Sequence, residues 1–321
     1  MFLQTEPTKQ NIVEAHERIK KHIHHTPILS SSLINKITSC KVYFKCENFQ
    51  KAGAFKFRGA SNAVLSLEKE ELQKGVATHS SGNHAAALSF IAQMKNIPAY
   101  IVMPHTAPQI KKTAVEGYGA KIIFCEPTQQ AREEALNKVV KETGAVFVHP
   151  YNNYSVVAGH ATCAKEILVK LSDIDYIIPP VGGGGLASGT CLSAKYFSNK
   201  TKVIGAEPIG ADDAFRSLRD KTIYPSVNPK TICDGLLTSL GDKTYSILSE
   251  NLDEILNASE EAIIEAMKLI WERMKIIVEP SSAVTLAVVL ENKEKFAGKK
   301  IVLILSGGNV ELTKLPFKNS D

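Results

Sequence analysis

Over residues 75–145 of this 321-residue chain, short runs of apolar residues alternate with segments in which apolar residues recur at the spacing of a helix. Four runs bounded by turn residues predict strands, at 75–79, 100–103, 121–125 and 146–149. The spacing between them predicts helices, at 85–94, 107–118 and 128–143. Alternation of this kind indicates a parallel sheet with helices on both faces.

A second α/β series occupies the rest of the chain. It predicts strands at 42–46, 176–181, 202–206 and 300–305, and helices at 9–25, 59–67, 161–171, 186–197, 259–274 and 281–290. The N-terminal segment belongs with the later series, so the first series looks inserted. We therefore expect two open, twisted, mainly parallel sheets: a large domain of residues 1–68 and 154–321, and a small domain of residues 69–153. Ligands of such sheets bind beyond the carboxyl ends of the strands.

Composition places the chain among ordinary globular proteins, with 44% hydrophobic and 22% charged residues. The net charge of +5 is mild and favours anionic small molecules, and no Lys/Arg run indicates nucleic acid. No apolar run is long enough to cross a bilayer, and the start of the chain lacks the pattern of a secretory signal. Six cysteines without a C-x-x-C pair indicate reduced thiols, so we expect a cytoplasmic protein.

Lys56 stands between Phe55 and Phe57, with Gly53 and Gly59 on either side. An apolar pocket lowers a lysine's pKa and yields a nucleophilic amine that can form a Schiff base. The glycines allow backbone to pass close to a flat ligand. Taken alone, the motif favours an ordinary loop with one snorkelling lysine.

A run of four glycines, Gly182 to Gly185, follows a predicted strand and opens a predicted helix. Such a turn is a cradle for an anion, because unhindered N–H groups and the helix dipole point at it. The run also fits a loose dinucleotide pattern with Ala187, and Glu207 follows at a suitable distance for a ribose. A nicotinamide-dependent dehydrogenase is therefore an alternative, although it leaves Lys56 without a role.

Two further polar turns end predicted strands: Ser80-Ser-Gly-Asn-His84 and Ser306-Gly-Gly-Asn309. A helix N-cap would explain the first and a tight turn the second. A neutral serine at position 306 could instead hydrogen-bond a heterocyclic nitrogen. Together the four segments describe one ligand with a phosphate, a heterocycle, a phenolic oxygen and an aldehyde, which is pyridoxal phosphate.

From His25-Thr-Pro27 to Thr313, this set of motifs resembles the fold-type II pyridoxal-phosphate enzymes, which are tryptophan synthase β-like, and within them the serine/threonine dehydratase and serine racemase group. The resemblance places the cofactor in the cleft between the domains. It implies that Lys56 carries the cofactor as a Schiff base and exchanges protons on one face, and that Phe55 lies beside the ring. Asn83 would bond the phenolic oxygen and Ser306 would face the pyridine nitrogen. The phosphate would be held by Gly182, Gly183, Gly184, Gly185 and Leu186.

The resemblance also implies where the substrate binds. Its carboxylate would lie on the turn made by Ser80, Ser81, Gly82, Asn83 and His84. Ser81 stands where serine racemases carry the serine that exchanges protons on the opposite face, whereas plain threonine dehydratases typically read S-A-G-N-H there. A helix-capping role is the alternative for Ser81.

Regulatory sites are implied more weakly. Glu207, the Ala211 carbonyl and Asp213 match a loop that binds Mg²⁺ or Ca²⁺ in serine racemases, and a solvated acidic turn is the alternative. Four positions match contacts to an activating nucleotide, ATP, namely Ser31, Ser32, Lys51 and Tyr118. Ala86 replaces a glutamine that helps to bind this nucleotide in animal serine racemases. His160 stands where relatives usually have glutamine.

The activity implied by the resemblance is interconversion of L- and D-serine, accompanied by elimination of water to give pyruvate and ammonia. An L-threonine/L-serine or 3-hydroxyaspartate dehydratase is the alternative within the family. Outside it, a nicotinamide-dependent dehydrogenase and a catalytically silent binding protein stay open. A homodimer is implied by resemblance only.

Overall fold

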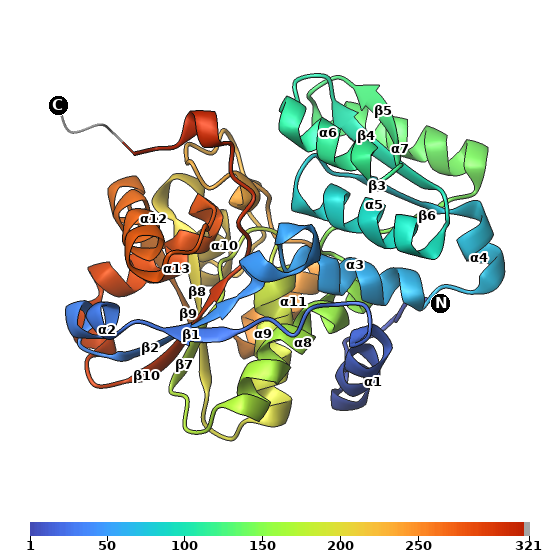
Figure 1. Ribbon diagram of the computed structural model, residues 1–321. Helices are drawn as coiled ribbons and strands as arrows, with labels where there is room; N and C mark the ends of the chain where they lie inside the picture. Colours follow the sequence, from blue (N-terminus) through green and yellow to red (C-terminus); the bar gives the residue numbers. More distant parts are fainter. Residues whose placement is uncertain (318–321) are drawn as a thin grey trace.

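The computed structural model describes residues 1–317, and its strands form two separate sheets (Figure 1). The smaller sheet has the order β5-β4-β3-β6 and is wholly parallel. Its strands are β3 (Val76–His79), β4 (Ala99–Pro104), β5 (Lys121–Cys125) and β6 (Val146–Phe147). The larger sheet has the order β1-β2-β10-β7-β8-β9, in which only β1 runs antiparallel. Its strands are β1 (Ile28–Ser30), β2 (Lys41–Cys46), β7 (Tyr176–Ile178), β8 (Lys202–Pro208), β9 (Glu254–Ala258) and β10 (Lys300–Leu305).

Helices flank both sheets, so the predicted fold class is confirmed. Around the smaller sheet lie α4 (Lys69–Lys74), α5 (Asn83–Lys95), α6 (Gln109–Gly117) and α7 (Gln129–Thr143). The other helices are α1 (Lys9–Ile19), α2 (Ser32–Thr38), α3 (Lys56–Leu65), α8 (Tyr154–Lys170), α9 (Gly185–Phe197), α10 (Asp213–Arg219), α11 (Asp242–Asn251), α12 (Glu260–Met274), α13 (Pro280–Glu291) and α14 (Lys293–Phe296). Helix α3 shares one hydrophobic cluster with α5, and the domain boundaries at 68/69 and 153/154 stay a prediction.

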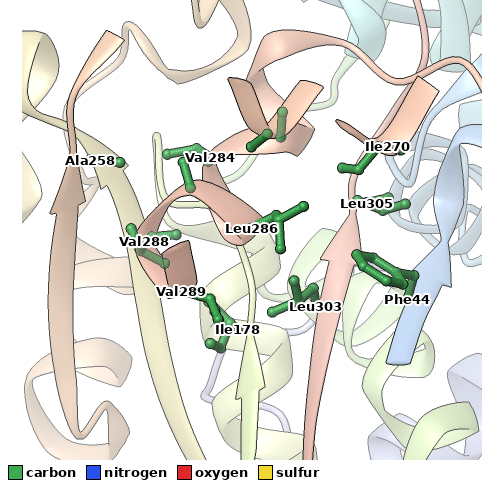
Figure 2. Close-up of a cluster of buried hydrophobic side chains, with 14 of the residues drawn as sticks. Phe44, Ile178, Ala258, Ile270, Val284, Leu286, Val288, Val289, Leu303 and Leu305 are labelled. Carbon is green, nitrogen blue, oxygen red and sulfur yellow. The ribbon is translucent and has the colours of Figure 1, made fainter. Parts of the chain in front are cut away.

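The largest hydrophobic cluster lies between the six-stranded sheet and helix α13 (Figure 2). Val284, Leu286 and Val288 of α13 are fully buried with Ile178 of β7 and Leu303 of β10. A helix that is apolar all round is buried on all sides, and α13 is of this kind. This packing fixes the residue before the helix, Glu279, at the edge of the sheet.

Glycines let helices α3, α8 and α9 approach one another closely. A Cβ at Gly159 of α8 would lie 2.6 Å from the carbonyl oxygen of Arg58 in α3. A Cβ at Gly189 of α9 would lie 2.6 Å from the backbone nitrogen of Ala161 in α8. Helix α8 is therefore packed tightly against two neighbours: α3, which carries the candidate lysine, and α9, which follows the four glycines.

Several predicted boundaries were wrong, and three of the differences have a clear physical cause. The helix predicted at 9–25 ends at Ile19, because the backbone and ring of His24 bond Gln50 and Phe49 instead of continuing the helix. The strand predicted at 176–181 ends at Ile178, since Pro179 and Pro180 have no N–H to donate. The helix predicted at 161–171 begins at Tyr154, where the side chain of Asn153 accepts the N–H of Val156.

A buried cluster of four charged side chains joins β2, α3 and α8. Arg58 donates to Glu47 at 2.7 and 2.8 Å and to Glu166 at 2.7 and 2.9 Å. Lys45 donates to Glu166 at 2.6 Å. Burial alone would raise the pKa of both carboxyls, but the positive charges hold the pKa of Glu166 at about 2 and that of Glu47 below its usual value. Both carboxyls and the guanidinium of Arg58 are therefore ionised at neutral pH.

We expect Arg58→Met to lower the free energy of unfolding by about 3–5 kcal/mol, because it leaves two buried carboxylates without their cation. Chemical denaturation at pH 7 measures the change. Lys200→Met is the matched control, since its ion pair with Asp173 is exposed, and it should leave the unfolding curve unchanged.

The difference in the free energy of unfolding between the wild type and Arg58→Met should depend on pH. The folded-state pKa values of Glu47 and Glu166 are depressed, so their stabilisation is complete above about pH 4.5 and is lost as the pH falls towards 2. The free energies of unfolding of the wild type and Arg58→Met should therefore become more similar below pH 4.5. A constant difference would show that the loss comes from packing rather than charge.

Candidate active site

A cleft of about 610 Å³ lies between the two sheets and brings the four predicted segments together. It is lined by Lys56, by the turn at residues 80–84, by the glycine run with Leu186, and by Ser306. The turns follow β3, β7 and β10 at their carboxyl ends, where ligands of parallel sheets bind. The predicted placement of these segments in one cleft is confirmed, and the role of each residue stays a prediction.

Lys56 is the first residue of α3 and points into the cleft. Its Nζ donates to the carbonyl oxygen of Pro150 at 2.8 Å and lies 5.1 Å from the ring centroid of Phe55. Burial lowers the pKa of Lys56 to about 8, while the nearby carboxylate of Glu279 acts in the opposite direction. A substantial fraction of this amine is therefore neutral near physiological pH, as a nucleophilic lysine requires.

The glycine run forms a turn at the start of α9 that carries no side chains. Gly184 has φ +84°, and as N-cap it offers no side chain to the first N–H groups of the helix. A Cβ at Gly184 would lie 2.8 Å from the Leu240 side chain, and a Cβ at Gly183 would overlap the ring of Tyr151. Only glycine fits these positions. The turn therefore fits a phosphate group, which the N–H groups and the helix dipole would hold.

The turn at residues 80–84 leads into α5, whose N-cap is Gly82 and has no side-chain cap. The alternative that Ser80 or Ser81 caps this helix is therefore wrong. Both serines line the cleft, as does the buried His84, whose ring Nε2 is 3.1 Å from the carbonyl oxygen of Val148. An uncapped helix start with two hydroxyls beside it suits a carboxylate.

Asn83 is held by two partners from the opposite wall. Its Nδ2 donates to both oxygens of Glu279, at 2.9 and 3.1 Å, and its Oδ1 accepts from Asn309 at 2.9 Å. Burial raises the pKa of Glu279 to about 7. Asn83 therefore has a fixed orientation across the cleft.

Ser306 ends β10 and is buried at the inner end of the cleft. Its Oγ lies 3.1 Å from the Oγ of Ser282, which also bonds the backbone of Gly307 at 2.7 and 2.8 Å. A neutral hydroxyl in this position can hydrogen-bond a ring nitrogen without protonating it. The residues present thus fit pyridoxal phosphate at its phosphate, its aldehyde and its ring nitrogen.

The cleft residues that the sequence analysis missed include Arg132, His149, Tyr151 and Glu279. His149 follows β6, so the rule of strand carboxyl ends could have found it. Its Nδ1 accepts the N–H groups of Tyr151 and Asn152 at 3.3 and 2.9 Å, and burial lowers its pKa to about 3. His149 is therefore a neutral ring with its proton on Nε2. Arg132 lies at an ordinary position of α7 and Glu279 is the residue before α13, and neither position carries a sequence signal.

The predicted cation loop follows β8. Both carboxylate oxygens of Glu207 accept backbone N–H groups at the start of α10, from Ala214 at 3.0 Å and Phe215 at 2.9 Å. Asp213 is buried, and its Oδ2 has no partner within residues 1–317. Burial raises the pKa of Glu207 to about 8 and that of Asp213 to about 6. Nowhere in the described part of the chain do three or more acidic, His or Cys side chains form a metal-binding group, so a cation here would have two carboxylates at most.

The four nucleotide positions do not meet within one chain. Ser31 caps α2, while Tyr118 follows α6 and stacks on Phe90 at 4.7 Å. Lys51 lies over the ring of Phe57. Helices α2 and α6 are on opposite sides of the molecule (Figure 1).

The chain was also compared with known proteins. Residues 19–307 match the family model "Pyridoxal-phosphate dependent enzyme". A β-hydroxyaspartate dehydratase of Paracoccus denitrificans is 51% identical over 97% of this chain and 99% of its own length. A serine racemase of Dictyostelium discoideum is 48% identical over 96% of each chain. Its crystal structure superposes with a TM-score of 0.91 at 49% identity, covering 95% of this chain and 99% of that one.

A serine racemase of maize has the same fold, with a TM-score of 0.94 and 43% identity over 96% of this chain and 95% of that one. The chain belongs to the pyridoxal-phosphate-dependent enzyme family. It resembles the racemase and dehydratase branch over nearly its whole length. The nicotinamide-dependent alternative has no support among these relatives, and the dinucleotide-like glycine pattern is part of the phosphate turn. No helix within residues 1–317 is long and apolar enough to cross a membrane.

We expect the rate at which pyridoxal phosphate links to the cofactor-free protein to rise with pH and to level off above about pH 8, because the neutral amine of Lys56 reacts. Stopped-flow absorbance between pH 6.5 and 9.5 measures this rate. Lys56→Ala should abolish the linkage.

The same pH profile of the linkage rate can be measured in the variant Glu279→Gln. The charge of Glu279 raises the pKa of Lys56, so its removal should shift the midpoint of the rate profile to lower pH. A wild-type midpoint near 10.5 would contradict the assignment of Lys56 as a buried nucleophile.

Proposed function

We propose that this protein is a serine racemase that interconverts L- and D-serine and also eliminates water from serine to give pyruvate and ammonia. The observation that carries this proposal is the cleft in which Lys56, with a pKa of about 8, faces the same space as the serine turn and the glycine turn. The relatives named above, a dehydratase and a racemase, are similar to this chain over nearly its full length.

When bound, pyridoxal phosphate supplies an electron sink for the bond broken at the α-carbon of the substrate. Lys56 then takes the α-proton, for which its partly neutral amine is suited. The start of α5, with Ser80 and Ser81, receives the substrate carboxylate. The closely packed walls limit the access of water to the inner end at Ser306.

Racemisation needs a second proton-exchanging group on the face opposite Lys56, whereas elimination does not. Ser81 is the candidate, because it lines the cleft and does not cap α5. A serine hydroxyl is a weak base, so its proton would be relayed by the phosphate group or by water.

We expect Ser81→Ala to lower the rate of racemisation about 100-fold or more, the usual contribution of a general acid or base, while elimination from L-serine persists. Chiral chromatography of D-serine and a coupled pyruvate assay measure both rates on one sample. Ser80→Ala is the control from the same turn and should lower both rates in parallel. A parallel loss in Ser81→Ala would leave Ser81 with carboxylate binding alone.

The test of the function itself is the product pattern from L-serine, L-threonine and L-3-hydroxyaspartate. A racemase makes D-serine from the first substrate. If the wild type makes no D-serine but releases ammonia from any of the three, the chain is a dehydratase. If no substrate is consumed, the family's chemistry has been lost.

A 3-hydroxyaspartate dehydratase is the second candidate, and Arg132 is the observation that favours it. Arg132 lines the outer cleft, and its Nε is buried without a partner in the described residues. A second carboxylate on the substrate would pair with this guanidinium. Arg132→Met should then lower kcat/KM for 3-hydroxyaspartate about 10- to 100-fold and leave that for serine unchanged.

We further propose that Mg²⁺ or Ca²⁺ binds at Glu207, the Ala211 carbonyl and Asp213, with water as the remaining ligands. The support is the buried, unpartnered Oδ2 of Asp213 beside a second carboxylate. The cation would order the start of α10 and take no part in proton transfer.

We expect a chelator to lower the melting temperature, and Mg²⁺ or Ca²⁺ to restore it, with about 2.7 kcal/mol of stabilisation at 100 times the dissociation constant. Asp213→Asn should remove this dependence. Scanning calorimetry with and without the cation provides the measurement. If the chelator has no effect on the wild type, the loop is an acidic turn.

The remaining assignments are a homodimer, activation by ATP, and a cytoplasmic location. Ser31 and Ser32 are at the start of α2 and Tyr118 is at the end of α6, on opposite sides of the molecule (Figure 1), so one nucleotide would contact all of them only where two copies of the chain associate. All six cysteines are buried and unpaired, which supports a reducing compartment. Sedimentation with and without ATP tests the first two proposals together.

A further inference from the structure

His160 is a fully buried histidine of α8 that none of the steps above uses. Neither of its ring nitrogens has a hydrogen-bond partner within residues 1–317. A neutral imidazole carries one donor and one acceptor nitrogen, and leaving both unpaired in the interior costs stability. Folding alone therefore gives no reason for a histidine at this position.

The ring of His160 touches three parts of the candidate cofactor site. It meets the ring of Phe55 edge to face, with the centroids 4.7 Å apart and an interplanar angle of 62°. A Cβ at Gly59 of α3 would lie 2.7 Å from both ring nitrogens. A Cβ at Gly185, the first residue of α9, would lie 3.4 Å from Cδ2. The ring thus fills the space between the helix that starts at Lys56 and the glycine turn.

This space is narrow, and the ring that fills it is uncharged. Helices α3 and α8 approach so closely that only glycine fits at positions 59 and 159. Burial lowers the pKa of His160 well below its usual value, and the charges of Lys56 and Arg58 lower it further. The side chain is therefore a flat, neutral group at the working pH of the protein.

We propose that His160 is a positioning residue of the cofactor site. Its flat ring sets the distance between Lys56 on α3 and the glycine turn at α9, and it fixes the position of the Phe55 ring by packing against it. The inference rests on pyridoxal phosphate as the cofactor. Glutamine, which the resemblance places here in related chains, is also planar and uncharged. A branched side chain such as leucine is not flat, and it would push α3 away from α8.

The test compares His160→Leu with His160→Gln in the cofactor-free protein. Three quantities are measured: the melting temperature, the dissociation constant for pyridoxal phosphate, and the fraction of bound cofactor linked to Lys56 after borohydride reduction and mass spectrometry. His16→Leu is the matched control, because it removes another imidazole with an unpartnered nitrogen on α1, outside the cleft.

For His160→Leu we expect an unchanged melting temperature, since removing two unpaired nitrogens offsets the poorer fit. Its dissociation constant should rise about tenfold, as for the loss of one good contact, and the linked fraction should fall. His160→Gln and His16→Leu should stay within about threefold of the wild type.

Two results would overturn the proposal. One is a His160→Leu protein that binds and links the cofactor like the wild type. The other is a melting temperature that falls together with the affinity in both His160 variants, which would make the ring a packing element only. A wild-type protein that binds no pyridoxal phosphate would instead refute the cofactor assignment, and with it this inference.

Discussion

The buried charge cluster around Arg58 is the interaction on which the site depends. Lys45 and Glu47 come from β2 and the turn after it, Glu166 comes from α8, and Arg58 lies two residues after Lys56. Such a cluster adds little net stability compared with apolar packing, but breaking it leaves an uncompensated charge in the interior. It therefore acts as a constraint on geometry: strand, turn and two helices can meet in only one arrangement. The position of the Lys56 amine is a consequence of that arrangement.

The cluster also explains the electrostatics of the cleft. Its two cations and two carboxylates neutralise one another, so it adds no net charge beneath Lys56. Around the amine, burial keeps His84, His149 and His160 neutral, and Glu279 is the carboxylate that acts on it. At the inner end, attraction for an anion thus comes from backbone N–H groups rather than from cationic side chains. A backbone site does not titrate, which suits a cofactor whose phosphate must stay bound while nearby groups exchange protons.

Sequence patterns predicted those parts of the fold and the site that depend on neighbouring residues in the chain. Runs bounded by turn residues located β3, β4 and β5, and glycine requirements located the turn at Gly182 to Gly185. Sequence patterns failed to predict the elements whose bounds are set by contacts between residues far apart in the chain. The first helix stops at Ile19 because Gln50 bonds the following segment, and α10, α11 and β9 lie in a polar stretch with no clear period. Arg132 looks like an ordinary helical charge and Glu279 like an ordinary charge before a helix, and only tertiary packing places both in the cleft.

The two walls of the cleft differ in what they contribute, and this difference accounts for the mixture of activities among the relatives. The larger sheet and its helices supply the glycine turn, Ser306 and Glu279, which line the side of the cleft where we propose that the cofactor binds. The smaller sheet supplies Ser81 and Arg132, which line the side of the cleft where we propose that the substrate binds. Substitutions on the smaller side can thus change the opposite-face proton donor or the favoured side chain without disturbing the cofactor. A racemase and a dehydratase can therefore share about half of their residues with this chain and keep the same cofactor site.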